Sequence, residues 1–414
     1  MGVKTLDVFY KGRQVGTLAE TEDKRIAFQY SDDWIKNGFS ISPFSLPLKS
    51  DVYVPDYDTF TYFKGLFGVF ADSLPDSWGE LLLDRTLTNM GIDRDSLNTL
   101  ERLSYIGNSG MGALEYYPSK TTDYSIKGLS YDEIAAECKN ILESKPSEKL
   151  DLLYNLGGPS GGTRPKILID ENGEDYIIKF PASRDEIISG IREYEYSLCA
   201  KKAGIIMTDT FLVPSEISQG YFKTKRFDRD GKEKIFSITF AGLLEADFRA
   251  PTCDYSTYMR LINALTKENK KQIEQMFRIM CFNIYSHNLD DHTKNFSFLF
   301  KDDIWSLAPA YDLTYSETHY GEHTTSVDGK GTGIKDEDLI NIGVKAGLKY
   351  NRCKVILNEI KECIPMIDKY LARHTITRNS KIDIKDRIKE VKDNNPVPKK
   401  ETISQDNKGD DGAI

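Results

Sequence analysis

The residues best suited to chemistry lie within residues 286–295, SHNLDDHTKN. Asp290 stands five residues before Asn295, an apolar run follows, and a second aspartate, Asp312, comes seventeen residues after Asn295. Catalytic loops of the kinase type have the same Asp-x4-Asn spacing, followed by a strand and a metal-binding aspartate. In that chemistry one carboxylate orients the attacking hydroxyl group and accepts its proton, whereas the amide and the second carboxylate hold magnesium on the phosphates. The spacing therefore predicts Asp290 as the catalytic base and Asn295 and Asp312 as magnesium ligands.

The same segment allows another interpretation, a metal-dependent phosphohydrolase. Mixed sets of histidine and aspartate bind catalytic metals, and the segment offers four such side chains: His287, Asp290, Asp291 and His292. The three other histidines are not joined to a second cluster of aspartates that would complete a metal cage. This interpretation also leaves Lys294 and Asn295 without a role, so the kinase-type interpretation accounts for more of the segment.

A glycine-rich turn at residues 156–166, LGGPSGGTRPK, comes directly before a predicted strand hairpin. The hairpin is predicted because two apolar runs flank Asn172-Gly173, and Asn-Gly is the strongest short hairpin signal. Glycines let backbone N–H groups approach phosphate oxygens closely, so Gly161 and Gly162 are candidate phosphate-binding residues. A plain turn is the alternative, because glycine is a default turn residue.

Lys179 lies inside the second apolar run of that hairpin. A lysine is costly to bury without a partner, and a kinase uses a strand lysine to pair with the phosphates of the nucleotide. An edge-strand lysine that deters aggregation is the alternative, but the preceding glycine turn favours phosphate binding. The next predicted helix, residues 185–203, carries Glu193 and Glu195, and one helix glutamate steadies the strand lysine in kinases. The spacing does not choose between the two, and both are otherwise expected to be solvated acids.

The charged segment 225–229, KRFDR, ends a strand-like stretch and lies between the strand-rich and the helical parts of the chain. A two-lobed kinase has its hinge, which holds the adenine ring, at this place in the order of elements. Lys225 and Phe227 are therefore candidate nucleotide-binding residues. Without the flanking motifs, an exposed and charged strand end would be the better interpretation.

Composition limits the classes of function. The net charge is −9 and the pI is about 5.3, so a broad nucleic-acid-binding surface is not expected, although a local basic patch is compatible with these values. The six cysteines are scattered without a Cys-x-x-Cys pair, which is typical of a reducing cytoplasm. There is neither a signal-type apolar stretch nor an apolar run of the length that spans a membrane, so we expect a cytoplasmic protein without membrane contact.

The 414 residues suggest two or three domains. The pattern of elements predicts a mixed α/β unit over 1–125 and a strand-rich unit with the glycine turn and hinge over 126–260. A helical catalytic unit is predicted over 261–390, where apolar residues recur at steps of three and four before His287. The polar residues 391–414 are predicted to form a disordered tail.

With these residues in hand, the chain resembles the HipA family of kinases, the toxin half of HipA–HipB toxin–antitoxin pairs. The resemblance covers most of residues 1–380, and the block 288–297, NLDDHTKNFS, is its most specific motif. The other motifs are ADSLPDSWG at 71–79, LLDR at 82–85, LSYIG at 103–107, GAL at 112–114, GGTRPK at 161–166, IKFP at 178–181, RFDR at 226–229 and YDL at 311–313.

The resemblance implies an α+β, two-lobed protein-kinase-like fold, with a strand-rich N-lobe, an extra N-terminal subdomain and an all-helical C-lobe. It implies ATP and Mg²⁺ as cofactors, with Asp290 as the catalytic base and Asn295 and Asp312 as magnesium ligands. The nucleotide-binding positions that it implies are Gly161, Gly162, Lys179, Lys225, Phe227, His292 and Lys294.

Members of this family phosphorylate serine or threonine on proteins, in known cases aminoacyl-tRNA synthetases, which halts translation and favours dormancy. The resemblance therefore implies a serine/threonine kinase toxin, neutralised by a HipB-like helix-turn-helix antitoxin, with DNA contacted mainly through the antitoxin complex. Some members inactivate themselves by phosphorylating a serine in the glycine turn. Pro159 occupies that position here and Ser160 follows it, so autophosphorylation at Ser160 is a hypothesis that rests on the neighbouring hydroxyl group.

A catalytically silent subunit that docks on a helix-turn-helix repressor is the competing interpretation from another class. Such a subunit would not need the chemical groups of a kinase. The presence of all four, Lys179, Asp290, Asn295 and Asp312, favours the enzyme.

Overall fold

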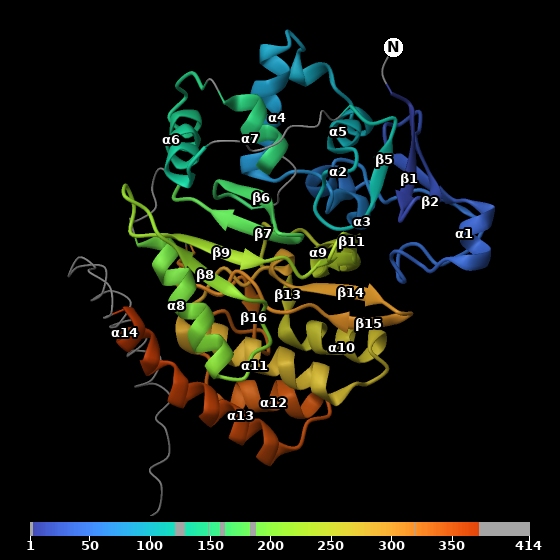
Figure 1. Cartoon of the computed structure of the whole chain (residues 1–414). Coiled ribbons are helices and arrows are strands. Elements are labelled where there is room, and N and C mark those ends of the chain that lie inside the picture. The colour runs from blue at the N-terminus through green and yellow to red at the C-terminus, as the bar shows by residue number, and fades with distance from the viewer. Residues whose placement is uncertain are drawn as a thin grey trace, which may run out of the picture.

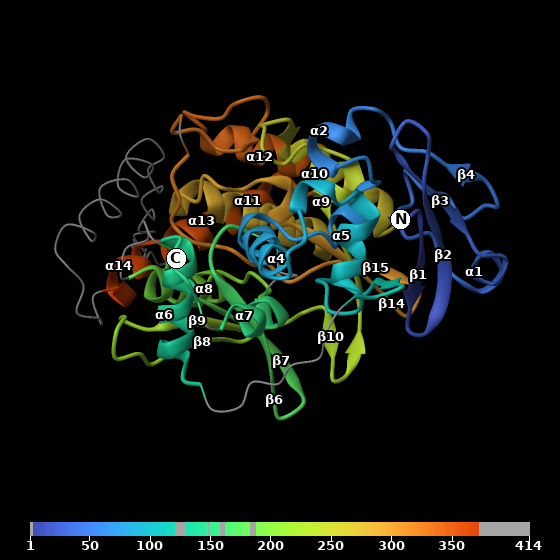
Figure 2. The ribbon, with the colours of Figure 1, turned by 90° about the horizontal axis from the view of Figure 1, so that it is seen from above.

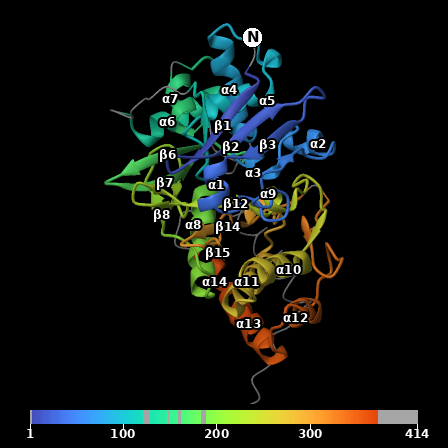
Figure 3. The ribbon, with the colours of Figure 1, turned by 90° about the vertical axis from the view of Figure 1, so that its right-hand side faces the viewer.

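The computed structural model describes residues 3–120, 129–147, 149–157, 162–182, 188–318 and 320–371. Ser160 and Gly161 and the tail predicted over 391–414 lie outside the described residues. Three parts follow one another along the chain, an N-terminal sheet, a central sheet and a mostly helical part (Figure 1). The N-terminal sheet and helices α11 to α13 lie at opposite ends of the molecule (Figure 3).

The first part contains a five-stranded sheet with the order β4-β3-β2-β1-β5. Leu6 and Val8 alternate with more exposed residues and are buried on one face of β1. Lys11 and Gly12 both have positive φ, 48° and 73°, which suits the tight turn between the twisted strands β1 and β2. The elements are β1 (Thr5–Tyr10), β2 (Arg13–Glu20), β3 (Ile26–Tyr30), α1 (Asp32–Asn37), β4 (Val52–Tyr53), α2 (Thr59–Phe63), α3 (Gly68–Ala71), α4 (Ser77–Asn89), η1 (Arg94–Ser96), α5 (Thr99–Ile106) and β5 (Glu115–Tyr117).

The second part is a four-stranded antiparallel sheet with the order β6-β7-β9-β8. Asn172 and Gly173 have positive φ, 59° and 84°, and close the predicted hairpin between β6 and β7. Its elements are α6 (Tyr131–Leu142), α7 (Leu150–Gly157), β6 (Lys166–Glu171), β7 (Glu174–Lys179), α8 (Ser189–Lys202), β8 (Thr210–Val213), β9 (Tyr221–Lys225), β10 (Arg229–Asp230), β11 (Glu233–Lys234), β12 (Phe236–Thr239) and α9 (Phe240–Leu244).

Helix α4 of the first part packs on the second part. It lies beside α7 (Figure 2), and Trp78 and Leu82 belong to the same buried cluster as Ile167 and Ile178 of the β6–β7 hairpin. Helix α4 begins directly after Pro75-Asp76. Because this helix shares a hydrophobic core with the β6–β7 hairpin, the first part is anchored to the strands that carry Lys166 and Lys179.

The third part contains the long helix α11 and is not all-helical, which corrects the sequence-based expectation. The apolar run after Asn295 forms a strand, since it pairs with β12 on one side and with β15 on the other. Asp302 and Asp303, with φ of 52° and 59°, form the tight turn between these strands. The elements are β13 (Cys253–Asp254), α10 (Tyr255–Leu265), α11 (Lys270–Ser286), η2 (Thr293–Asn295), β14 (Ser297–Lys301), β15 (Ile304–Leu307), β16 (Thr325–Ser326), α12 (Asp336–Lys345), α13 (Tyr350–Cys363) and α14 (Pro365–Leu371).

The predicted apolar stripe of α11 is buried, with Ile273, Met276, Phe277 and Met280 fully enclosed. It packs against α10 and α13, so the helix is fixed in the core of the third part. No helix in the described part of the chain is long and apolar enough to cross a membrane.

Candidate active site

Helix α11 delivers the chain to the predicted catalytic loop and ends at His287. The C-cap residue His287 has φ of 58°, and its N–H bonds the carbonyl of Asn283, which stops the helix. Its ring stacks on Tyr315, with centroids 5.2 Å apart. The buried helix α11 therefore fixes where the catalytic loop begins. The stacking of His287 on Tyr315 fixes the direction of the chain after the helix.

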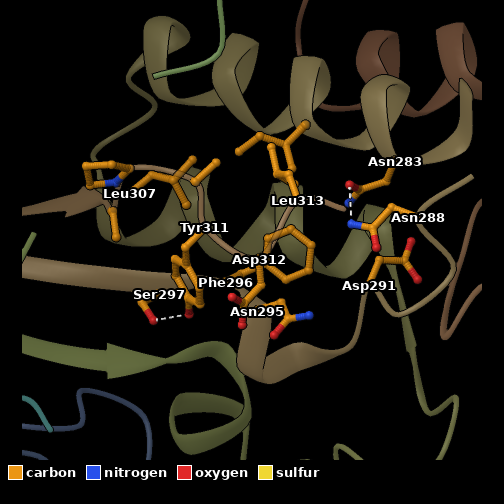
Figure 4. Close-up of a pocket in the computed structure, with 14 residues that line it drawn as sticks. Asn283, Asn288, Asp291, Asn295, Phe296, Ser297, Leu307, Tyr311, Asp312 and Leu313 are labelled. Atoms are coloured by element: carbon orange, nitrogen blue, oxygen red, sulfur yellow. Dashed lines mark hydrogen bonds between the residues drawn. The ribbon is translucent and has the colours of Figure 1, made fainter. Parts of the chain in front are cut away.

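A series of hydrogen bonds holds the predicted catalytic loop in place. The Asn288 amide donates to Asn283 Oδ1 at 3.0 Å, as Figure 4 shows. Ser316 Oγ donates to Asn288 Oδ1 at 2.8 Å and accepts from the backbone N–H of Asp290 at 2.9 Å. Asn288 and Ser316 also form a parallel β-bridge. The segment after Asp312 thus holds the backbone that carries Asp290.

Asp291 points into the interior and serves the structure of the loop. Its carboxylate accepts from Tyr255 Oη at 2.8 Å and from the Thr325 N–H at 3.0 Å, and it lies 3.1 Å from His323 Nδ1. Because these contacts occupy both oxygens, Asp291 is unsuited to the metal cage of the phosphohydrolase interpretation. In the described ranges no three His, Cys, Asp or Glu side chains gather in a way that could hold a metal ion.

Asp290 remains accessible, since 57 % of its side chain is exposed, and His292 Nε2 lies 3.6 Å from it. The Asn295 side-chain amide donates to the backbone carbonyl of Asp290 at 2.6 Å, which ties the two ends of the Asp-x4-Asn motif together. Desolvation raises the pKa of Asp290, and the negative charge of nearby Asp312 adds to this effect while His292 opposes it. A raised pKa suits a group that accepts a proton from a hydroxyl group.

Lys179 joins three elements. Its ammonium group lies 2.6 Å from Glu193 Oε1 on α8 and forms a second ion pair with Asp312. Burial opposes the charge of Lys179, but the two carboxylates outweigh it and raise its pKa. Burial likewise opposes the charge of Asp312, whereas Lys179 and Lys166 hold the pKa of that carboxyl well below its usual range. The structure therefore selects Glu193, and not Glu195, as the partner of the strand lysine.

Lys166 is a buried member of this cluster that the sequence analysis did not single out. It stands directly opposite Lys179 in the β6–β7 register, so the two side chains share one face of the sheet. Burial and the neighbouring Lys179 lower the pKa of Lys166 to about 8, although Asp312 and Glu193 oppose this shift. The turn at Asn172-Gly173 already implies this pairing, because it fixes the hairpin register.

Asn295 precedes β14 and Asp312 follows β15, so both offer oxygen ligands near the open end of this antiparallel strand pair. Both line the small cavity shown in Figure 4, about 10 Å³ in volume, beside the buried amides of Asn283 and Asn288. Carboxylate and amide oxygens suit Mg²⁺, which takes one or two carboxylates and completes its shell with phosphate and water. These two residues would therefore fit a magnesium ion.

Lys294 and His292 of the same loop both lie against the ring of Phe248. The Lys294 ammonium group forms an ion pair with Asp76 at 2.6 Å and lies 4.2 Å from the centre of the Phe248 ring. The His292 ring is tilted against the same ring, with centroids 5.8 Å apart. Phe248 and Asp76 were not predicted as site residues, because nothing in the linear sequence brings them to this loop.

The two predicted hinge residues, Phe227 and Lys225, have different surroundings. The ring of Phe227 lies against Tyr311, 5.3 Å between centroids, next to Asp312. Lys225 instead forms an ion pair with Glu174 at 2.5 Å on the sheet, and the intervening Arg226 is buried in an ion pair with Asp228. Phe227 is therefore near the cluster, whereas the Lys225 ammonium group is engaged at the β6–β7 hairpin.

The order of elements and the grouping of a strand lysine, a helix glutamate and a loop aspartate define a protein-kinase-like fold with two lobes. The model of the HipA-like C-terminal domain matches residues 159–367, and that of the HipA N-terminal domain matches residues 6–117. The chain belongs to the HipA family.

Two relatives show the extent of this likeness. The HipA chain in a complex of HipA, HipB and operator DNA from Shewanella oneidensis MR-1 has a TM-score of 0.69 and 18 % identity, with 94 % of this chain and 96 % of that chain covered. The putative kinase Y4mE of Sinorhizobium fredii (strain NBRC 101917 / NGR234) is 24 % identical over 344 residues, 76 % of this chain and 77 % of that protein. The first likeness shows that the whole described fold is that of HipA.

Proposed function

We propose that this chain is an ATP- and Mg²⁺-dependent serine/threonine protein kinase, the toxin of a toxin–antitoxin pair. The observation that carries the proposal is the Lys179 ammonium group between Glu193 and Asp312, beside a braced loop that presents Asp290. A repressor-docking subunit without activity would not need two buried lysines beside a carboxylate, since such a cluster is costly unless it has a function.

Each residue has a role that follows from its surroundings. Lys179 and Lys166 would neutralise the phosphates, while Asn295 and Asp312 would hold magnesium. When bound, ATP with magnesium supplies the phosphoryl group that is transferred. Asp290, half exposed and with a raised pKa, would orient the substrate hydroxyl group and accept its proton. His292 and Phe227 flank this site and remain candidates for contact with the nucleotide.

The partners follow from the family. The Shewanella HipA was solved with HipB and operator DNA, and on this basis we propose a HipB-like helix-turn-helix antitoxin that mediates most contact with DNA. We propose a protein substrate in the cytoplasm, for which the family resemblance suggests an aminoacyl-tRNA synthetase. Phosphorylation of such an enzyme would inhibit translation and cause growth arrest.

Incubation of the purified protein with labelled ATP, magnesium and cell extract tests the proposal. We expect one or a few labelled proteins, identified by mass spectrometry with phosphoserine or phosphothreonine, and no label with Asp290→Ala. Because the phosphate-binding candidate Lys179 is held by Glu193 and Asp312, the Asp290→Ala variant should still bind ATP. Full transfer by this variant would refute the role of Asp290. Release of phosphate from a model ester without ATP would instead support the phosphohydrolase. The same digest tests Ser160, which is expected to carry phosphate if the autophosphorylation hypothesis holds.

A further inference from the structure

Asp76 brings the N-terminal part of the chain into the candidate active site. It is the N-cap residue of α4, yet its side chain makes no capping hydrogen bond to that helix. One carboxylate oxygen instead accepts from the backbone N–H of Gly162 at 2.9 Å, and the other forms the 2.6 Å ion pair with Lys294. A single side chain therefore connects the glycine turn with the catalytic loop.

The contact between Asp76 and Lys294 is a largely buried ion pair. The side chains of Asp76 and Lys294 are only 19 % and 15 % exposed. Burial opposes the charge of Asp76, but Lys294 and the Gly162 N–H outweigh it and lower its pKa. Charge-assisted hydrogen bonds of this type are short and roughly twice as strong as neutral ones. Asp76 is therefore held as a carboxylate at the boundary between the two elements.

The segment before Asp76 is anchored to the core of the enzyme. Asp72 accepts from the backbone N–H of Thr239 at 2.7 Å and from its hydroxyl group at 2.8 Å, at the start of α9. Next to it, α3 meets α9 so closely that a Cβ atom on Gly68 would lie 2.3 Å from the carbonyl oxygen of Gly242. Only glycine fits this approach. The position of Asp76 is thus set by backbone packing and not by its own flexible side chain.

We infer that Asp76 is a positioning residue for the nucleotide, through which the N-terminal part holds the backbone at Gly162 in place and aims Lys294 at the phosphates. This inference rests on the proposed kinase function. It gives a physical role to the ADSLPDSWG motif, which the catalytic mechanism leaves unexplained. The N-terminal part then belongs to the nucleotide site and is not a separable docking module.

Variants of Asp76 in the full chain test the inference, with Asp84→Asn as the matched control. Asp84 lies on the same helix, is 18 % exposed, and forms ion pairs with Arg94 and Arg102 away from the site. We expect Asp76→Asn to weaken binding of a fluorescent ATP analogue and to raise the KM for ATP, each about tenfold, the loss expected for one charge-assisted hydrogen bond. Asp84→Asn should leave both values within about twofold, and Asp76→Glu should recover part of the loss.

A double-mutant cycle separates positioning from stability. If Asp76 acts through Lys294, then Asp76→Asn in a Lys294→Met background should weaken nucleotide binding much less than it does alone. Unchanged nucleotide binding and KM in Asp76→Asn, or an effect that is fully additive with Lys294→Met, would overturn the inference. A urea midpoint lowered equally in Asp76→Asn and Asp84→Asn, with KM unchanged, would overturn it as well and show a structural ion pair. Failure of the unmodified protein to bind the analogue would instead refute the proposed function.

Discussion

Replacing Lys179 by methionine removes the ammonium group that forms ion pairs with both Glu193 and Asp312. Methionine keeps most of the length and apolar volume of the side chain, so the change is mainly one of charge. Breaking a buried ion pair by removing one partner costs about 3–5 kcal/mol, because the other charge is left buried without compensation. Lys166 remains near both carboxylates, but Glu193 is almost fully buried and loses its direct ion pair with Lys179. We therefore expect a loss of about 3 kcal/mol in the free energy of unfolding, arising mainly at Glu193.

If the loss arises mainly at Glu193, the double variant Lys179→Met/Glu193→Gln should be more stable than Lys179→Met alone, because the buried charge of Glu193 is then removed as well. Urea unfolding at neutral pH measures both, with Lys301→Met as the control. The Lys301–Asp230 pair is 51 % and 62 % exposed, so its loss should cost less than about 1 kcal/mol. The double variant should remain unable to bind ATP productively, because the phosphate-binding cation is still absent. The reasoning fails if Lys179→Met costs no more than Lys301→Met, or if removing the Glu193 charge destabilises it further.

Two further predictions concern the groups around the loop. Ser316→Ala removes the hydroxyl group that accepts a hydrogen bond from the Asp290 N–H, so kcat should fall about tenfold with little change in the KM for ATP. Steady-state kinetics measure both constants, with Ser316→Thr as the control. An unchanged kcat in Ser316→Ala would contradict the prediction. Burial raises the pKa of Asp72 from 3.8 to about 6, with Lys294 and the Thr239 contacts opposing the shift. A raised pKa means that its stabilising contribution is complete below about pH 4 and is lost as the pH rises through 6. The stability of the unmodified protein relative to Asp72→Asn should therefore fall by about 2 kcal/mol between pH 4 and pH 7 in urea unfolding, and a constant difference would contradict the assignment.

The β6–β7 hairpin shows what local sequence predicts well. Asn172-Gly173 between apolar runs specified the turn, and the turn specified that Lys166 faces Lys179. The buried stripe of α11 was equally predictable, because its periodicity lies within a few residues. The all-helical C-lobe was wrong: the strand expected after Asn295 is present as β14, and short strands such as β13 and β16 depend on pairing between distant segments.

The sequence by itself determined the order of the chemical groups, because the catalytic loop, its following strand and the second aspartate are consecutive and their spacing is set by local geometry. Glu193 and Glu195 lie two residues apart on one helix, and only the approach of α8 to the sheet decided which of them meets Lys179. Asp76 and Lys294 are 218 residues apart. No local signal spans such a separation, because the contact exists only once two hydrophobic cores have packed and fixed the backbones that carry it.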